Sequence, residues 1–365
     1  MGIRIDDILI HRIIAPLKKP FHTKLQHVQE RESLIIEVRS GDYRGYGEGV
    51  AFTTPWYTEE TVKTTLFVLR HVLIPRVKGE VMTHPRNMYE LYETVKGNRM
   101  AKAALDMACW DLYAKVKGVP LYELYGGKKE AIDAGVVVTW KTEEELREEV
   151  QKAVDAGYRR VKIKIHRQID PQTIENVIRE FPETYFFADA NGSFTKQSIE
   201  KLQAFDAIGL RLIEQPFKKE DRILYEEWTP QFQTPIGLDE SIASYEDAEW
   251  AIQSGAADCI VLKPGRVGGP TVSLDIIQRA KEASIDLWIG GMIEFGVSKA
   301  HNIALATLEG VTLPGDFSAS NHFWERDIIT PGLTLCDGQM RVFNEPGIGV
   351  TIDKDVLKQY RVDTY

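Results

Sequence analysis

The sequence predicts an α/β protein: a TIM-type (β/α)7β barrel with an α+β N-terminal capping domain that is completed by the C-terminal tail. From about residue 131, seven short apolar segments alternate with helical segments in units of about 25 residues. Alternating units of this number indicate a parallel sheet that closes into a barrel. The first 100 or so residues read instead as strands followed by helices. A chain of 365 residues is also longer than most single domains.

The capping domain is predicted over residues 1–125. Apolar alternation indicates its strands, and glycines mark the turn between the second and the third. In "RMAKAALDMACWDLYAKVKG", Ala, Leu, Met and Trp recur at spacings of three and four, which predicts a long helix that ends at Gly118. The other predictions are strands at 6–17, 32–40 and 41–49, helices near 58–75 and 86–95, and loops at 17–31 and 52–60.

The barrel is predicted over residues 126–320, and the tail 321–365 is expected to return to the capping domain. The seven strands are expected at 134–140, 159–165, 185–190, 210–216, 235–241, 258–264 and 286–292. Their helices are expected at 142–155, 171–180, 195–205, 221–228, 244–254, 270–283 and near 297–307.

Charge and composition exclude several classes of function. The formal net charge of −9 argues against binding to nucleic acid or to an anionic membrane. No apolar run approaches the ~20 residues of a membrane span, and the first residues lack the apolar core of a signal peptide. The three cysteines are scattered, with no metal-type spacing, as expected of free thiols in a reducing cytosol. We therefore expect a cytoplasmic protein that acts on a small molecule.

Five successive barrel strands end in a charged residue. These residues are Lys164, Asp189, Glu214, Asp239 and Lys263, at intervals of 25, 25, 25 and 24. The carboxyl ends of the strands are where TIM barrels carry their active sites. A single charged residue there is often only a solvated rim position, but five in phase with the repeat predict a catalytic centre.

The three consecutive acids predict a metal site. Carboxylates from adjacent strands repel one another unless a cation neutralises them. Oxygen ligands select a hard divalent ion, so we expect Mg²⁺ at Asp189, Glu214 and Asp239, with Mn²⁺ as a substitute. The alternative is a hydrogen-bonded polar layer without metal.

The lysines on either side of the acids predict proton abstraction. In "VKIKI" strict alternation places Lys162 and Lys164 on one face of a strand. Nearby positive charges disfavour the protonated form of a lysine, which makes it a better base. A substrate carboxylate held by the metal, next to a carbon whose proton Lys164 removes, would match this arrangement.

The motifs at the strand ends resemble those of a known family. "VKIKI", "ADANGSF", "IEQPF", "LDES" and "LKPGRVGG" follow one another in the order of the strand-end motifs of the enolase superfamily, muconate-lactonizing subgroup. "AKAALDMACWDLYAKVKGVPLYELYGG" is similar to the helix and linker that enter that family's barrel. "KPGRVGG", "GGMIEFGVSKAHNIALATL" and "LPGDFSAS" resemble the o-succinylbenzoate synthases, in the branch where N-succinylamino acid racemase activity also occurs. The resemblance covers almost the whole chain.

The resemblance implies a role for each matching residue. Lys164 and Lys263 would act on opposite faces of the substrate, and the three acids would bind Mg²⁺. A second set of residues would surround the catalytic and metal-binding groups and orient them or adjust their charge. These residues are Lys162, Asn191, Glu240 and Arg266. Loops 17–31 and 52–60 would close over the site, with Phe21 and Tyr57 near an acyl or aromatic group, and Gly291, Met292 and Ile293 would line an apolar pocket.

The implied reaction is the Mg²⁺-dependent dehydration of 2-succinyl-6-hydroxy-2,4-cyclohexadiene-1-carboxylate, through an enediolate, in menaquinone biosynthesis. Racemisation of N-succinylamino acids is the alternative, and one chain could do both. A dipeptide epimerase is disfavoured because "PGDFSAS" has one acid, Asp316, in place of Asp-x-Asp. A cycloisomerase is disfavoured on the same loop motifs, and a non-catalytic binding barrel because all five charged residues are present. A homo-oligomer is the expectation for such an enzyme.

Overall fold

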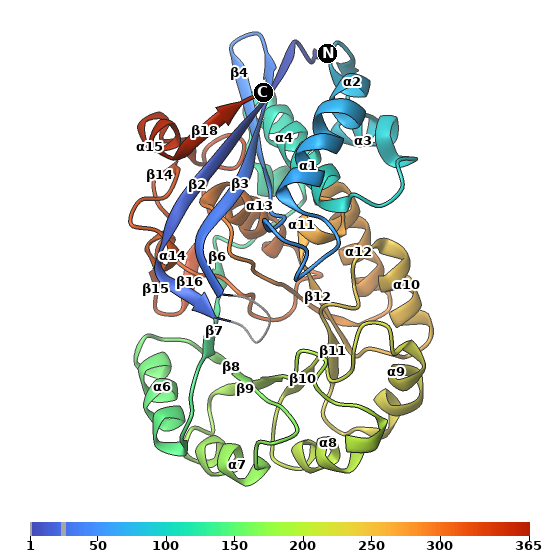
Figure 1. Ribbon diagram of the computed structural model, residues 1–365, viewed down its shortest axis with the longest axis vertical. Coiled ribbons are helices and arrows are strands. Elements are labelled where there is room, and N and C mark those ends of the chain that lie inside the picture. The colour runs from blue at the N-terminus through green and yellow to red at the C-terminus, as the bar shows by residue number, and fades with distance from the viewer. Residues whose placement is uncertain (1, 23–26) are drawn as a thin grey trace.

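The computed structural model describes residues 2–22 and 27–365 and has two parts, a capping region and a barrel (Figure 1). Both ends of the chain lie in the capping region, at the top of the view. Strands β7 to β11 and helices α6 to α9 lie in the lower part. Among the described residues, no helix is long and apolar enough to cross a membrane.

The capping region consists of strands followed by helices, as predicted. Its main sheet has the order β18-β2-β3-β4, with antiparallel pairs throughout. The elements are β1 (Ile3–Arg4), β2 (Asp7–His22), β3 (His27–Ser40), β4 (Tyr43–Gly49), α1 (Val62–Val68), a π-helical turn (Leu69–Leu73), α2 (Ile74–Val77), β5 (Val81–Met82), α3 (Pro85–Glu93), α4 (Arg99–Lys117) and α5 (Leu121–Leu124).

The long helix α4 packs directly against strand β4. Glycines on β4 allow this close approach, since a Cβ at Gly47 would lie 2.1 Å from the carbonyl oxygen of Ala104. A Cβ at Gly45 would lie 2.2 Å from the carbonyl oxygen of Ala108. Helix α4 ends at Gly118, whose φ of 69° is the left-handed conformation that glycine adopts readily.

The barrel sheet is parallel and follows the order of the sequence. Between residues 135 and 289, all of which the structure describes, seven strands pair in the order β7 to β13. The strands are β7 (Gly135–Val138), β8 (Arg160–Lys164), β9 (Tyr185–Asp189), β10 (Leu212–Glu214), β11 (Ile236–Leu238), β12 (Cys259–Leu262) and β13 (Asp286–Ile289). The helices are α6 (Glu143–Asp155), α7 (Pro171–Glu180), a 3₁₀ turn (Lys196–Ser198) with α8 (Ile199–Asp206), α9 (Arg222–Trp228) with a 3₁₀ turn (Thr229–Gln231), α10 (Tyr245–Gln253), α11 (Pro264–Val267), α12 (Pro270–Glu282) and α13 (Gly296–Ala306).

An irregular segment, 312–316, closes the barrel between its first and last strands. The amides of Thr312 and Asp316 donate to the carbonyls of Leu287 and Ile289 on β13. On the other side, the amide of Gly135 on β7 donates to the carbonyl of Gly315. This segment therefore takes the place of the eighth strand, which confirms the predicted (β/α)7β barrel.

The prediction that 17–31 is a loop is wrong for most of that segment. Strands β2 and β3 extend the hairpin to Phe21 paired with Val28, with an irregularity after Pro16; residues 23–26 lie outside the described part. Leu17 and Val28 are buried, so apolar side chains hold both strands at places where the surrounding sequence is polar. By contrast, 52–60 contains neither helix nor strand, as predicted.

The tail contacts both parts of the molecule. Strand β18 (Arg361–Thr364) joins the capping sheet beside β2, and β16 (Gln339–Arg341) pairs with β6 (Ala131–Asp133), before the first barrel strand. We propose the domain limits 1–125, 126–320 and 321–365 on these pairings. The remaining tail elements are α14 (Ser320–Phe323), β14 (Ile329–Thr330), β15 (Leu335–Cys336), β17 (Thr351–Ile352) and α15 (Lys354–Tyr360).

Candidate active site

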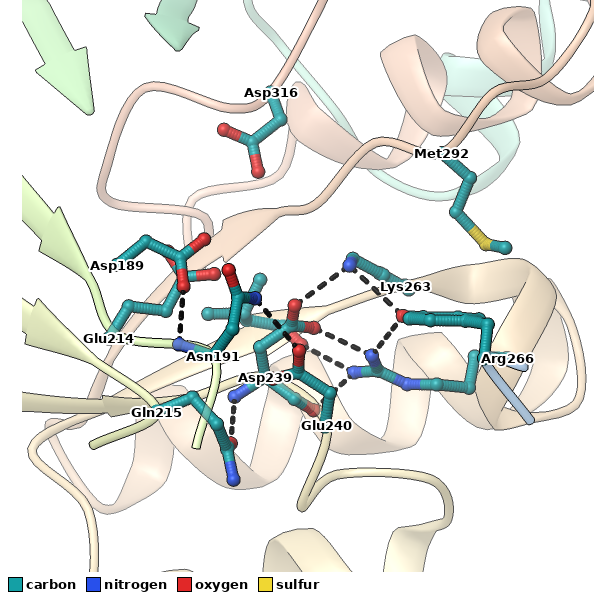
Figure 2. A network of polar contacts seen from close by, with 12 residues as sticks. Asp189, Asn191, Glu214, Gln215, Asp239, Glu240, Lys263, Arg266, Met292 and Asp316 are labelled. Carbon is teal, nitrogen blue, oxygen red and sulfur yellow. Dashed lines mark hydrogen bonds and ion pairs between the residues drawn. The ribbon is translucent and has the colours of Figure 1, made fainter. Parts of the chain in front are cut away.

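The five charged strand-end residues lie together at the carboxyl ends of the barrel strands. Lys164, Asp189 and Glu214 are in register across β8, β9 and β10. Asp239 and Lys263 come directly after β11 and β12. Figure 2 shows Asp189 and Glu214 on one side of this group and Lys263 on the other, with Asp239 between them. The predicted order of lysine, three acids and lysine is thus also an order in space.

Lys164 is the most accessible charge of the group. Its side chain is 45% exposed, whereas that of Asp189 is 2% exposed. Its Nζ donates to Asp189 Oδ2 at 2.5 Å and to Asn191 Oδ1 at 2.7 Å. The ammonium therefore has two oxygen partners and still faces the open side of the site, where a substrate can reach it.

Lys162 is buried beneath Lys164 and contacts three carboxylates. Its Nζ lies 3.0 Å from Glu214 Oε2, 3.1 Å from Asp316 Oδ2 and 3.7 Å from Asp189 Oδ2. Burial by itself would lower the pKa of Lys162, but these carboxylates hold the pKa well above its ordinary value. Two lysines are tolerated on one face of β8 because buried carboxylates compensate their charges.

The three predicted ligands form a donor set that fits a hard divalent cation. Burial, together with the nearby Asp189, raises the pKa of Glu214 to about 8, because a further negative charge is disfavoured beside the other carboxylates. In the described part of the chain, no three His, Cys, Asp or Glu side chains already surround one point closely enough to hold a metal. The carboxylates instead form ion pairs with lysine and arginine side chains. A bound divalent cation would have to replace these groups as the partner of the carboxylates.

On the far side of the site, Asp239 holds Lys263 and Arg266. Lys263 Nζ donates to Asp239 Oδ2 at 2.8 Å and to the Tyr57 hydroxyl at 3.0 Å. Arg266 donates to Asp239 Oδ1 at 2.6 Å and to the same hydroxyl at 2.7 Å. Burial would raise the pKa of Asp239, but the two cations hold it well below its usual range. Tyr57, from the capping region, therefore contacts both cations.

Asn191 and Glu240 connect the two sides. The Asn191 side chain accepts from Lys164 and donates to Glu240 Oε1 at 3.0 Å (Figure 2). The other carboxylate oxygen of Glu240, Oε2, is buried without a hydrogen-bond partner among the described groups. Burial and the neighbouring Asp239 raise the pKa of Glu240.

The predicted apolar residues are only partly brought to the site. Met292 is half-buried and packs with Tyr57 against a small cluster of Val50, Ala51 and Met100. Figure 2 shows Met292 on the side of Lys263, away from Asp189. The neighbouring Gly291 lies against the backbone of Asp316, while Ile293 is buried in the core. Phe21 lies near the tip of the β2–β3 hairpin, 38% exposed, and no contact among the described residues joins it to the charged group.

Three polar residues of the site were not predicted. Asp316 accepts from Lys162 and, at 2.5 Å, from Nη2 of the fully buried Arg160. Arg160 precedes Lys162 and Lys164 at the same spacing of two along β8, so the alternation that revealed the lysines could have revealed it too. The side-chain oxygen Oε1 of Gln215 accepts from the backbone amide of Asp239, which ties the ends of β10 and β11 together.

Comparison with known proteins agrees with this architecture. Residues 7–126 match the family described as "Mandelate racemase / muconate lactonizing enzyme, N-terminal domain", and 145–356 match "Enolase C-terminal domain-like". An o-succinylbenzoate synthase from Geobacillus kaustophilus is 42% identical over 362 residues, covering 99% of this chain and 96% of the relative. An N-succinylamino acid racemase from Thermus thermophilus is 38% identical over 349 residues, covering 95% of this chain and 94% of the relative.

The fold is also that of a solved structure. A crystal structure of an enolase-superfamily member from Listeria innocua superposes with a TM-score of 0.97 at 38% identity, over 100% of this chain and 98% of the other. Both family matches and the full-length relatives agree with the motifs at the strand ends and with the site that these motifs form. The chain is therefore an enzyme of the enolase superfamily, with the N-terminal and barrel domains of the mandelate racemase and muconate-lactonizing group.

Proposed function

We propose that this enzyme is an o-succinylbenzoate synthase, which dehydrates 2-succinyl-6-hydroxy-2,4-cyclohexadiene-1-carboxylate in menaquinone biosynthesis. The observation that carries the proposal is the placement of Lys164, beside Asp189, and Lys263, beside Asp239, on opposite sides of three buried carboxylates. The synthase from Geobacillus kaustophilus, 42% identical over nearly the whole chain, supports the same reaction. We further propose that the enzyme is a cytoplasmic homo-oligomer that acts on this small carboxylate.

In this mechanism Lys164 removes the proton next to the substrate carboxylate. As the base, Lys164 acts in its neutral form, and Lys162 places a positive charge beside the same Asp189 oxygen that Lys164 contacts. Lys263 stays protonated, because Asp239 holds its pKa well above the ordinary value against the effect of burial. Its positive charge then stabilises the enediolate that proton removal creates. The leaving hydroxide departs on the face of Lys164.

Mg²⁺, bound by Asp189, Glu214 and Asp239 and replaceable by Mn²⁺, would neutralise the substrate carboxylate and so acidify the adjacent C–H bond. Calorimetric titration with Mg²⁺ should detect binding to the wild type and weaker binding to Glu214→Gln, since a neutral amide is a poorer ligand. Chelation should abolish activity and Mg²⁺ or Mn²⁺ should restore it. Full activity of metal-free protein, or equal affinity in the variant, would refute this ligand set.

Racemisation of N-succinylamino acids is the second candidate. Arg266, which resembles the arginine of the racemase-containing branch, contacts the acceptors of Lys263, and the 38% identical racemase from Thermus thermophilus supports this reaction. Both activities begin with abstraction of the proton next to the substrate carboxylate, but racemisation uses both lysines as acid and base, one on each face of the substrate. The dipeptide epimerase and cycloisomerase readings remain weaker. The epimerase hypothesis is weakened because this loop has a single acid, Asp316. That acid already accepts hydrogen bonds from Lys162 and Arg160.

Single substitutions at the two lysines test the proposal. Lys164→Ala should lower the rate of dehydration by at least the ~10²–10⁴-fold typical of a general base, and Lys263→Ala should also lower it by removing the charge beside the enediolate. With N-succinylamino acids in D₂O, NMR should show that each variant loses α-proton exchange mainly for the opposite enantiomer. Loss of the same enantiomer in both variants would refute the two-sided arrangement. A wild type that turns over neither substrate would refute both candidates.

A further inference from the structure

A buried arginine of the capping sheet joins three separate segments beside the site. Arg31, on β3, is 1% exposed. Its Nε donates to the carbonyl of Ile293 at 2.7 Å, and its Nη2 donates to that of Val50 at 2.6 Å. Its Nη1 donates to the carbonyls of Ala51, at 2.7 Å, and Glu32. One guanidinium thus binds β3, the start of segment 50–57 and the chain that follows the last barrel strand.

All these acceptors are backbone carbonyls, which makes Arg31 unlike the other buried cations of the site. Lys162, Lys263 and Arg266 each contact a carboxylate. Burial lowers the pKa of Arg31 to about 10, so the guanidinium still carries its charge near neutrality. In the described part of the chain no carboxylate forms an ion pair with Arg31, although Glu48, Glu294 and Glu32 lie near enough to favour its charge, and burial of such a charge is costly for stability. Its retention at this place points to the geometry that its five planar donors impose on the three segments.

Two of the segments that Arg31 binds, the one that begins at Val50 and the one that contains Ile293, lie near Lys263. Val50 packs on helix α11, which follows Lys263, since a Cβ added to Gly265 would lie 2.5 Å from a Val50 methyl group. Ile293 follows Met292, which lies on the side of Lys263 in Figure 2. Arg31 therefore fixes two of the chain segments that surround this lysine.

A chain of aromatic contacts leads from Arg31 to Lys263 itself. The Arg31 guanidinium lies 4.5 Å from the centre of the Phe52 ring, a cation–π contact. Phe52 in turn packs against Tyr57, with the ring centres 6.1 Å apart at 79°. The Tyr57 hydroxyl accepts hydrogen bonds from Lys263 and from Arg266. Each of these three contacts is direct, and the chain of contacts begins at Arg31 on the capping sheet.

We propose that Arg31 is a positioning residue for Lys263: it fixes segment 50–57 on the barrel, so that Tyr57 holds the lysine ammonium against the substrate face. This inference rests on the proposed function, because it assigns to Lys263 a part in the reaction. It adds that the capping sheet determines the geometry of this catalytic cation. A lysine at position 31 would keep the charge but could not reach all three segments.

A double-mutant cycle separates this role from a general structural one. On whichever of the two reactions the wild type catalyses, Arg31→Lys should lower kcat by about 10- to 100-fold, the range for a misplaced catalytic group. In the Lys263→Ala background, the same substitution should cause little further loss, because the group that it misplaces is gone. Arg39→Lys, at the far, half-buried end of the same strand, is the matched control and should leave both backgrounds unchanged.

Two further measurements keep the test decisive if Arg31→Lys folds poorly. Phe52→Leu leaves the backbone acceptors of Arg31 in place and removes the ring that links it to Tyr57, and it should show the same non-additivity with Lys263→Ala. Amide hydrogen exchange of 50–57 should be faster in both variants than in the wild type. An equal loss of kcat in the wild-type and Lys263→Ala backgrounds, or unchanged amide exchange of 50–57, would refute the proposed role of Arg31. Such a result would leave the proposed function untouched. An inactive wild type would overturn the proposed function instead.

Discussion

Asp316→Asn should destabilise the protein by about 3 kcal/mol, the lower end of the ~3–5 kcal/mol cost of breaking a buried ion pair. The Asp316 carboxylate bridges two buried cations, Nη2 of Arg160 at 2.5 Å and Nζ of Lys162 at 3.1 Å. Without it, Lys162 keeps Glu214 at 3.0 Å, so most of the cost falls on Arg160. Among the described groups, Nε and Nη1 of Arg160 already lack hydrogen-bond partners.

Two features place the value at the lower end of that range. The amide oxygen of asparagine can still accept one hydrogen bond, so that not every contact is lost. The guanidinium of Arg160 also lies 5.3 Å from the centre of the Phe187 ring and 5.8 Å from that of Trp288, and these contacts remain. A loss of about 3 kcal/mol corresponds to a fall of about 0.5–1 M in the guanidinium chloride midpoint.

The assay is guanidinium chloride unfolding at pH 7, with Asp275→Asn as the control. Asp275 pairs with Arg86 at 2.8 Å, but both side chains are more than 40% exposed, so its loss should cost less than about 1 kcal/mol. The two cations hold the pKa of Asp316 well below its ordinary value of 3.8, although burial opposes them. The stability that it contributes is therefore present above 3.8 and is lost as the pH falls further. A destabilisation below 1 kcal/mol, or one that persists unchanged into strong acid, would refute this reasoning.

Burial raises the pKa of Asp106 from 3.8 to about 7, so the folded state retains a proton that the unfolded state has lost. Wild-type stability should fall as the pH rises through this window, by up to about 4 kcal/mol. Asp106→Asn should remove that fall, and a variant whose unfolding free energy keeps the wild-type pH dependence would contradict the assignment. If the β2–β3 hairpin covers bound substrate, amide exchange in 17–22 and 27–31 should slow when a substrate analogue is added. Unchanged exchange at saturation would exclude the hairpin as a lid.

The charged group of the site could be predicted because it follows from local periodicity. Strand alternation sends Lys162 and Lys164 to one face, and the repeat of about 25 residues places the acids at equivalent strand ends. The contacts of Asp316 could not be predicted in this way, because the segment that closes the barrel has no regular strand pattern of its own. The strand pairing of 17–22 with 27–31 is not evident from the sequence, because apolar side chains are few and widely spaced there.

By itself, the sequence determined the barrel, its strand order and the order of its charges, because each depends on patterns within a few tens of residues. Only the tertiary structure decided which groups partner these charges. Tyr57 meets Lys263 across 206 positions of the chain, and Arg31 meets Ile293 across 262. No spacing rule predicts such contacts. They depend on how the capping sheet packs onto the barrel, and that packing is determined by side-chain shape and burial over the whole interface.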